Sequence, residues 1–401
     1  MSRPTIIPPL VLLLSANLPF TTAAPSLTDD SKCACYLTNG TASNFFTHHK
    51  FFDFRNLHQY QGVPDPLDDP DASAAASLTS DFFATADWNS SWTVQNWNNS
   101  GGARSDASVL RVNSPNNVYI EKNGDPSPSS ETYLTLRTQR MGDFQTAAEL
   151  ESNSTGYHFL SVRMLARTTG SAGAVTALFT YRKADPSSSS AGGEDRVQEA
   201  DLEVITRDPR DLVHYTNQPS VSATSGDVVP DATRNVTLPG GLEWSDWAVH
   251  RLDWTPSQST WYVDGVQTAN ISFQVPRDPA QLILNSWSDG GQWTGNMSVG
   301  DAAFLQIQWL DMVYNSTDEG GVTKQKKKGL LLEGRADAGV GEGCKAVCSV
   351  DETSKTGTPV ILWTSGAGSV PSPGQINAGP GSRLAGWMPL GMILGMVYMS
   401  F

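Results

Sequence analysis

Residues 197–205 read Val-Gln-Glu-Ala-Asp-Leu-Glu-Val-Ile, with acidic and apolar residues in strict alternation. In a β-strand, residues two apart point to the same face. The carboxylates that then share one face are Glu199, Asp201 and Glu203. The small and aliphatic residues that then face a core are Ala200, Leu202 and Val204. The segment therefore predicts a strand with one acidic face and one buried face.

Three carboxylates in one row repel each other, so at least one pKa must rise unless cations or hydrogen bonds intervene. Stability alone gives little reason for such a row. Glycoside hydrolysis gives a reason, because one carboxylate attacks the sugar while a carboxylic acid protonates the leaving oxygen. Carboxyl groups about 5–5.5 Å apart are needed for a retaining mechanism, which requires a curved, twisted strand. A solvated acidic face or a calcium site are the alternatives.

Composition limits the class of protein. The chain has 401 residues, 39% hydrophobic and 17% charged, which excludes wholesale disorder. Lys plus Arg number 27 against 41 Asp plus Glu, for a net charge of −14. A surface of this sign repels phosphate backbones, so we expect no nucleic-acid partner.

The rest of the chain also reads as strands. Short alternating runs bounded by turn residues recur between about 30 and 350, without a long amphipathic helix. The run 303–313 is expected to place Leu305, Ile307 and Trp309 on one face. Asp264-Gly265 after Trp261-Tyr262-Val263 predicts a tight hairpin. Many strands and few helices predict an all-β sandwich or jelly roll.

Both ends resemble processing signals. Residues 1–24 have a basic start, a short apolar core and small residues, which predicts a secretory signal peptide. Residues 351–383 are a Gly/Ser/Pro-rich linker, and 384–401 are an uncharged apolar tail. This order is typical of a GPI-anchor signal, with Asn377 as the expected attachment residue and with Gly379 and Ser382 as alternatives that leave a shorter spacer. A plain transmembrane tail is the alternative.

Eight Asn-X-Ser/Thr sequons fit an exported glycoprotein. Their asparagines are Asn39, Asn89, Asn98, Asn153, Asn235, Asn270, Asn296 and Asn315.

Four cysteines are expected to form disulfides in an oxidising compartment. Cys33 and Cys35 lie too close together to pair without strain, so we expect two bridges to Cys344 and Cys348. Which cysteine of each pair joins which stays open.

The 199–203 segment, Glu-Ala-Asp-Leu-Glu, resembles the Glu-X-Asp-X-Glu signature of glycoside hydrolase family 16, the laminarinase- and lichenase-like enzymes. Segments in the same order as in that family extend across about 150–315. They are Gly156-Tyr157 to Met164, Gly173 to Tyr181, Trp247 to Gly265, and Asn285-Ser286-Trp287 to Gly295. The N-terminal Cys33-Ala34-Cys35-Tyr36 and 48–53 are similar to fungal secreted members. Ala200 departs from the larger aliphatic residue common in the family.

The resemblance implies a concanavalin A-like β-jelly-roll over 25–350 with a curved substrate cleft. It implies that Glu199 is the nucleophile, that Glu203 is the general acid/base, and that Asp201 tunes the nucleophile. Substrate-binding residues expected in the cleft segments are Trp287, Trp293, Trp247, His250 and Asn285. No cofactor or catalytic metal is expected; some family members hold a structural calcium, which nothing here locates.

The expected function is a retaining endo-β-1,3- or β-1,3/1,4-glucanase acting on cell-wall or plant β-glucan. One alternative is a GPI-anchored cell-wall glucan/chitin transglycosylase, and another is a non-catalytic carbohydrate-binding protein. We expect a secreted or surface-anchored monomer that touches membrane only through the GPI anchor.

Overall fold

The computed structural model describes residues 25–184, 197–222, 227–318 and 344–364. Strands dominate these residues, and they form one large sheet and one small sheet. The strands of the large sheet are β4 (His48–Asp53), β5 (Trp92–Val94), β6 (Leu110–Asn113), β7 (Val118–Lys122), β8 (Thr132–Arg140), β9 (Phe144–Ser152), β10 (Tyr157–Gly170), β11 (Val175–Arg182), β12 (Gln198–Ile205), β13 (Leu212–Gln218), β14 (Thr233–Thr237), β15 (Ala248–Trp254), β16 (Ser259–Val263), β17 (Val266–Ile271), β18 (Gln281–Trp287) and β19 (Ala302–Ser316). The strands of the small sheet are β1 (Ser26–Leu27), β2 (Cys35–Leu37), β3 (Phe45–Phe46), β20 (Ala346–Ser349) and β21 (Val360–Thr364).

Helical structure is sparse in the described part of the chain. Its one α-helix is α1 (Ala86–Asn89). The 3-10 turns are η1 (Asp30–Lys32), η2 (His58–Tyr60), η3 (Pro70–Ala75), η4 (Asp81–Ala84), η5 (Pro115–Asn117), η6 (Pro230–Ala232) and η7 (Pro239–Gly241). Within these residues no helix is long and apolar enough to span a membrane.

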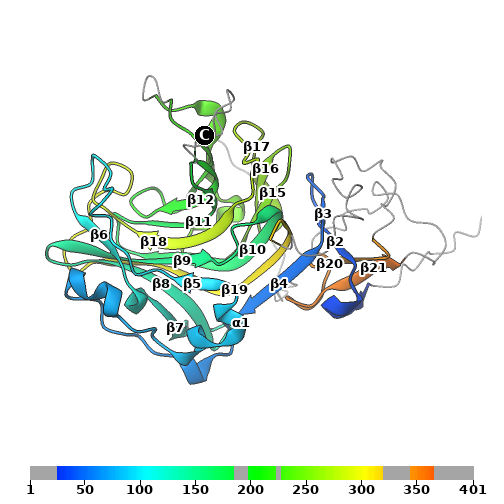
Figure 1. Cartoon of the computed structure of the whole chain (residues 1–401), viewed down its shortest axis with the longest axis horizontal. Coiled ribbons are helices and arrows are strands. Elements are labelled where there is room, and N and C mark those ends of the chain that lie inside the picture. The colour runs from blue at the N-terminus through cyan, green and yellow to red at the C-terminus, as the bar shows by residue number, and fades with distance from the viewer. Residues whose placement is uncertain (1–24, 185–196, 223–226, 319–343, 365–401) are drawn as a thin grey trace, which may run out of the picture.

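The large sheet folds over on itself to make two layers (Figure 1). One layer runs β14-β13-β12-β11-β18-β9, and β9 also pairs with β8, where the second layer β8-β19-β10-β15-β16-β17 begins. The core between the layers contains Leu178, Leu202 and Leu284 from the first and Val162, Leu252 and Leu305 from the second. The predicted all-β sandwich is therefore confirmed.

The expected hairpin is present between β16 and β17. Asp264 has φ 47° and Gly265 has φ 77°, the left-handed pair that a tight two-residue turn needs.

The expectation for β19 is wrong at one residue. Leu305 and Ile307 face the core, but Trp309 packs on Phe51 of β4, outside that core. The cause is a β-bulge: Leu165 pairs with Trp309, whereas the next residue, Ala166, pairs with Ile307. The extra residue reverses the alternation, so that Leu310 and Met312 point inward.

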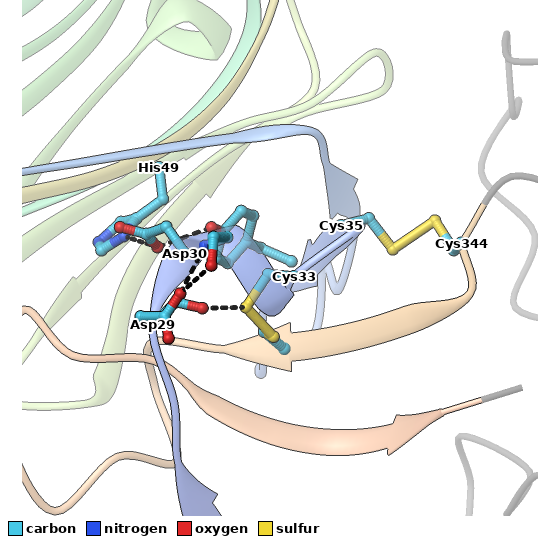
Figure 2. The surroundings of a disulfide bond; sticks show 9 residues. Asp29, Asp30, Cys33, Cys35, His49 and Cys344 are labelled. Atoms are coloured by element: carbon cyan, nitrogen blue, oxygen red, sulfur yellow. Dashed lines mark hydrogen bonds and ion pairs between the residues drawn. A yellow bond between two sulfur atoms is a disulfide. The ribbon is translucent and has the colours of Figure 1, made fainter. Parts of the chain in front are cut away.

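The small sheet joins the two ends of the described chain beside the sandwich (Figure 1). Strand β2 pairs with β20, and disulfides connect Cys33 to Cys348 and Cys35 to Cys344 (Figure 2). The two bridges expected between the cysteine pairs are thus present. The domain boundary predicted at residue 350 is wrong, because β21 completes this sheet and the folded region extends to Thr364.

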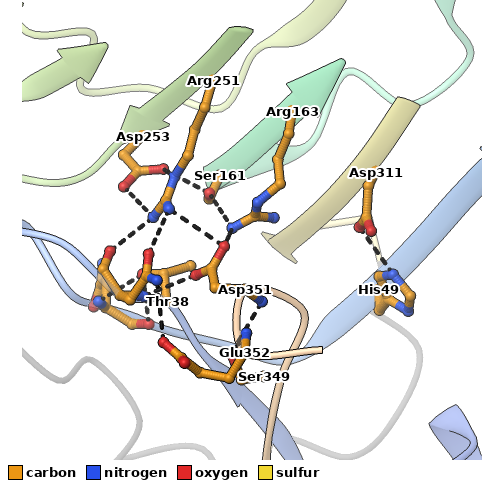
Figure 3. Close-up of polar contacts among 12 residues, drawn as sticks. Thr38, His49, Ser161, Arg163, Arg251, Asp253, Asp311, Ser349, Asp351 and Glu352 are labelled. Atoms are coloured by element: carbon orange, nitrogen blue, oxygen red, sulfur yellow. Dashed lines mark hydrogen bonds and ion pairs between the residues drawn. The ribbon is translucent and has the colours of Figure 1, made fainter. Parts of the chain in front are cut away.

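A charged network holds the small sheet against the sandwich (Figure 3). Arg163 on β10 and Arg251 on β15 are direct cross-strand partners, an arrangement in which like charges repel. Arg251 makes a bidentate pair with Asp253 (2.7 Å to each oxygen), and Asp351, from the segment after β20, approaches both arginines. Burial opposes ionisation of Asp351, but the two arginines hold its pKa below its usual value.

A second charged cluster, centred on the buried ring of His49, lies close by. The ring of His49 places Nδ1 2.7 Å from Asp30 and Nε2 3.0 Å from Asp311. Burial favours the neutral ring, but these two carboxylates outweigh it and raise the pKa of His49 to about 9. His49 is therefore an imidazolium at neutral pH that links the first segment to β19.

The predicted signal peptide, the linker beyond Thr364, Asn377 and the apolar tail lie outside the described residues.

The contacts of protonated His49 with Asp30 and Asp311 predict that the protein loses stability as pH rises. The folded pKa of His49 lies above its unfolded value of about 6.5, so its contribution is complete below that value and disappears as pH rises through 9. We expect His49→Gln to lower the free energy of unfolding by about 2–3 kcal/mol at pH 6 and by much less at pH 10. Urea denaturation at both values measures this.

The matched control is His58→Gln, which changes an exposed histidine beside Glu131. An equal loss for His49→Gln at both pH values would show that packing, not charge, is what the ring provides.

Candidate active site

Strand β12 presents its three carboxylates on one face, as the alternation predicted. Ala200, Leu202 and Val204 are buried in the core between the layers. The opposite face of β12 points away from that core and bears Glu199, Asp201 and Glu203. Strands β11 and β13 pair on either side, which fixes the row in the middle of a sheet.

All three carboxyl groups have raised pKa values. Burial and then the charge of Glu203 raise the pKa of Glu199 to about 7. Burial and the charges of both glutamates raise the pKa of Asp201 well above its usual range. Burial also raises the pKa of Glu203, although Trp293, His214 and Arg104 partly oppose this. Burial and mutual repulsion therefore favour at least one protonated carboxyl group in the row.

A line of side chains crosses the sheet at the level of Glu203. The register makes direct neighbours of His214 on β13, Glu203 on β12, Ala177 on β11, Asn285 on β18 and Glu149 on β9. Adjacent strands lie about 4.8 Å apart, so neighbouring members of the line follow each other at about this spacing. Ala177, the smallest member, is buried in the apolar cluster against which Trp287 and Trp293 pack.

Two of the predicted tryptophans lie at this face. Trp293 Nε1 donates to Glu203 Oε1 at 3.3 Å. Trp287, at the end of β18, packs in one apolar cluster with Trp293 and with Phe179 of β11. Flat aromatic surfaces beside carboxylates suit the apolar faces of sugar rings.

The structure places Trp247 and His250 elsewhere. Trp247 donates to Asp125 (2.9 Å) and lies under the guanidinium of Arg167, on the outer side of the second layer. His250, on β15, is buried and lines an internal cavity with Leu202, on the core side of β12. Burial lowers its pKa to about 4, so the ring is neutral. The prediction that these two residues contact substrate is wrong, because β15, which contains His250 and directly follows Trp247, belongs to the other layer.

Asn285 lies where it was expected, beside residues that the sequence did not single out. Asn285 Nδ2 donates to Glu149 (3.4 Å), while its buried Oδ1 has no protein partner. Burial raises the pKa of Glu149 to about 7, against the opposing charge of Arg111. The guanidinium of Arg111 lies 5.0 Å from the ring centres of both Trp97 and Trp287. The far end of the line therefore combines a buried carboxyl group, an amide and a guanidinium, of which Asn285 Oδ1 and Arg111 Nε have no hydrogen-bond partner in the protein.

One signal for Glu149 was present in the sequence. Glu149-Leu150-Glu151 repeats the acidic alternation of β12 on a second strand. Arg111 has no such signal, since its position depends on β6 pairing in parallel with β9.

Gln218 fixes the central carboxylate. Its Nε2 donates to Asp201 Oδ2 at 3.3 Å. Its Oε1 accepts from the backbone N–H and the hydroxyl of Ser220 at 2.8 and 2.9 Å. Because the oxygen is occupied, the amide must turn its nitrogen toward Asp201.

Among the described side chains, no group of three or more His, Cys, Asp or Glu is arranged to hold a metal ion.

Comparison with known proteins gives matches over the same region. The family model "Glycosyl hydrolases family 16" matches residues 107–310. The beta-glucanase of Paenibacillus polymyxa is 22% identical over 204 residues, which are 50% of this chain and 75% of the relative. The beta-glucanase of Bacillus subtilis is 23% identical over 186 residues, 45% of this chain and 68% of the relative. A solved prokaryotic beta-1,3-1,4-glucanase (lichenase) from a mouse hindgut metagenome superposes with a TM-score of 0.43 and 18% identity, over 67% of this chain and 99% of that one.

The acidic row predicts a stability cost at higher pH. The folded pKa of Glu199 lies above its unfolded value, so protonated Glu199 favours folding below about pH 4.5 and this contribution is lost as pH rises through 7. We expect Glu199→Gln, which cannot ionise, to be more stable than wild type at pH 8 by on the order of 1–3 kcal/mol. At pH 4.5 the difference should nearly vanish. Urea denaturation at both values provides the test, and an unchanged difference would contradict the raised pKa.

Proposed function

The chain belongs to family 16 of the glycosyl hydrolases, and on that premise we propose that it cuts β-glucan chains internally by a retaining double displacement. Its relatives named beta-glucanase support β-glucan as the class of substrate, and within that class we propose β-1,3 or mixed β-1,3/1,4 linkages as the target. The observation that supports the site most directly is the row on β12, where three carboxyl groups with raised pKa values adjoin Trp293.

The first step uses two of these groups. Glu199, as carboxylate, attacks the anomeric carbon and forms a glycosyl ester. The bond from that carbon to the leaving oxygen breaks, and protonated Glu203 gives its proton to this oxygen. Asp201, held by Gln218, keeps its own proton and lowers the pKa of Glu199 through their contact, which favours the ionised nucleophile.

The second step reverses these roles. Glu203, now a carboxylate, takes a proton from water as the water oxygen attacks the anomeric carbon. The ester bond to Glu199 breaks, and both carboxyl groups return to their starting states. The anomeric configuration is therefore kept.

Substrate binding is assigned to the line from Glu203 to Glu149. Trp287 and Trp293 offer apolar surfaces, whereas Asn285 Oδ1 and Arg111 Nε are buried polar atoms without protein partners. Buried polar atoms lose free energy when they stay unpaired, so pairing with sugar hydroxyls would offset the cost of shifting the side chains that cover them.

Replacing the nucleophile tests the mechanism. We expect Glu199→Gln to keep less than about a hundredth of the wild-type rate, because a covalent catalyst contributes several kcal/mol. Glucan binding and the circular dichroism spectrum should be preserved. Glu131→Gln, which changes an exposed carboxylate, should retain wild-type activity. A Glu199→Gln rate above that limit would remove Glu199 from this role.

Product analysis tests both the linkage and the fate of the intermediate. We expect laminari- and mixed-linkage oligosaccharides to give shorter products, whose first-formed reducing ends are β by proton NMR. α-Configured first products would contradict double displacement. Products longer than the donor, or glucan–chitin hybrids formed with chito-oligosaccharide acceptors, would identify a transglycosylase instead. Mass spectrometry distinguishes these outcomes.

A further inference from the structure

Asn235 lies at one end of the line of side chains that crosses the catalytic face. It is on β14, the edge strand of the first layer, and is the direct register partner of His214, itself the partner of Glu203. Two strand spacings separate Asn235 from Glu203, or about 10 Å. The side chain of Asn235 is exposed.

A chain of contacts connects Asn235 to the acid/base. Asn235 Oδ1 lies 2.9 Å from His214 Nδ1, and His214 Nε2 lies 2.7 Å from Asp208 Oδ2. The His214 ring packs edge-on against Trp293, which in turn donates to Glu203. All of these side chains therefore lie on the same face, and Asn235 marks the end of that face beyond Glu203.

Asn235-Val236-Thr237 is a sequon, and its amide nitrogen is available. The contact with His214 uses Oδ1, which an N-linked sugar leaves intact. In three other sequons Nδ2 already donates to the protein: Asn39 to Glu352, Asn153 to the Asn89 carbonyl, and Asn315 to the Phe45 carbonyl. Of the four sites Asn39, Asn153, Asn235 and Asn315, only Asn235 has an Nδ2 that makes no hydrogen bond to the protein, and Asn235 also lies on the catalytic face.

We propose that Asn235 bears an N-linked glycan that limits how far a substrate chain extends past Glu203. The inference rests on the proposed function. In the modification, Nδ2 forms a bond to the anomeric carbon of a lipid-linked sugar pyrophosphate, the carbon–oxygen bond to the pyrophosphate breaks, and the amide loses one proton. One N–H of the amide and Oδ1 remain.

A glycan at Asn235 makes the two ends of the line of side chains different. Toward β18 and β9 the line ends in polar groups that can bind sugar, whereas toward β14 it ends in a glycan. A bulky, hydrated oligosaccharide at Asn235 collides with substrate units that continue over β13 and β14. Short chains that end near Glu203 do not reach it.

The test uses one position and two substitutions. Thr237→Ala destroys the sequon and keeps Asn235 and its contact with His214, whereas Thr237→Ser keeps the sequon. Both proteins and wild type are secreted from a eukaryotic host, and glycopeptide mass spectrometry measures occupancy at Asn235. The ratio of kcat/KM for polymeric β-glucan to that for a short oligosaccharide is then measured.

We expect occupancy in wild type and Thr237→Ser only. Loss of the glycan should raise the polymer-to-oligosaccharide ratio about threefold or more, because a steric block on longer chains is removed. An unmodified Asn235 in wild type overturns the site, and an unchanged ratio in Thr237→Ala overturns its effect on chain length. Inactivity of all three proteins on every β-glucan overturns the proposed function and the length effect, but mass spectrometry still decides the glycan.

Discussion

Strand β12 must satisfy two opposing requirements in eight residues. One side is part of a close-packed core, and the other holds three carboxyl groups that repel each other. A single strand can do this only because its side chains alternate, and only if the neighbouring strands fix its register. The positions of Asn285, Glu149, His214 and Gln218 all follow from that register.

The second layer has a comparable electrostatic problem on its outer face. Arg163 and Arg251 lie opposite each other, and the compensating carboxylate, Asp351, comes from the far end of the folded chain. Near the other terminus, Asp30 likewise contributes a carboxylate, which contacts His49 together with Asp311. The small sheet is therefore an integral part of the fold, since it supplies charges that the sandwich lacks.

The sequence was sufficient where a local rule decided the outcome. Alternation located Glu199, Asp201 and Glu203 on one face, and Asp264-Gly265 located a hairpin. It was insufficient where the outcome depended on which layer a strand joins, as for Trp247 and His250. A β-bulge moved Trp309 to the opposite face, and no residue type in the sequence predicts that bulge. Glu149 was within reach of the alternation rule, but Arg111 required the pairing of β6 with β9.

The disulfides also set an order of events during synthesis. Cys33 and Cys35 leave the ribosome early, yet their partners lie 315 and 309 residues further along. At about 5–20 residues per second, that interval lasts roughly 15–60 s. During this time both thiols are free to form mixed disulfides with other proteins, so faithful maturation depends on an environment that can also break wrong bonds. The small sheet consequently closes only after all strands of the sandwich have been synthesised, so the sandwich can assemble before the two disulfides form.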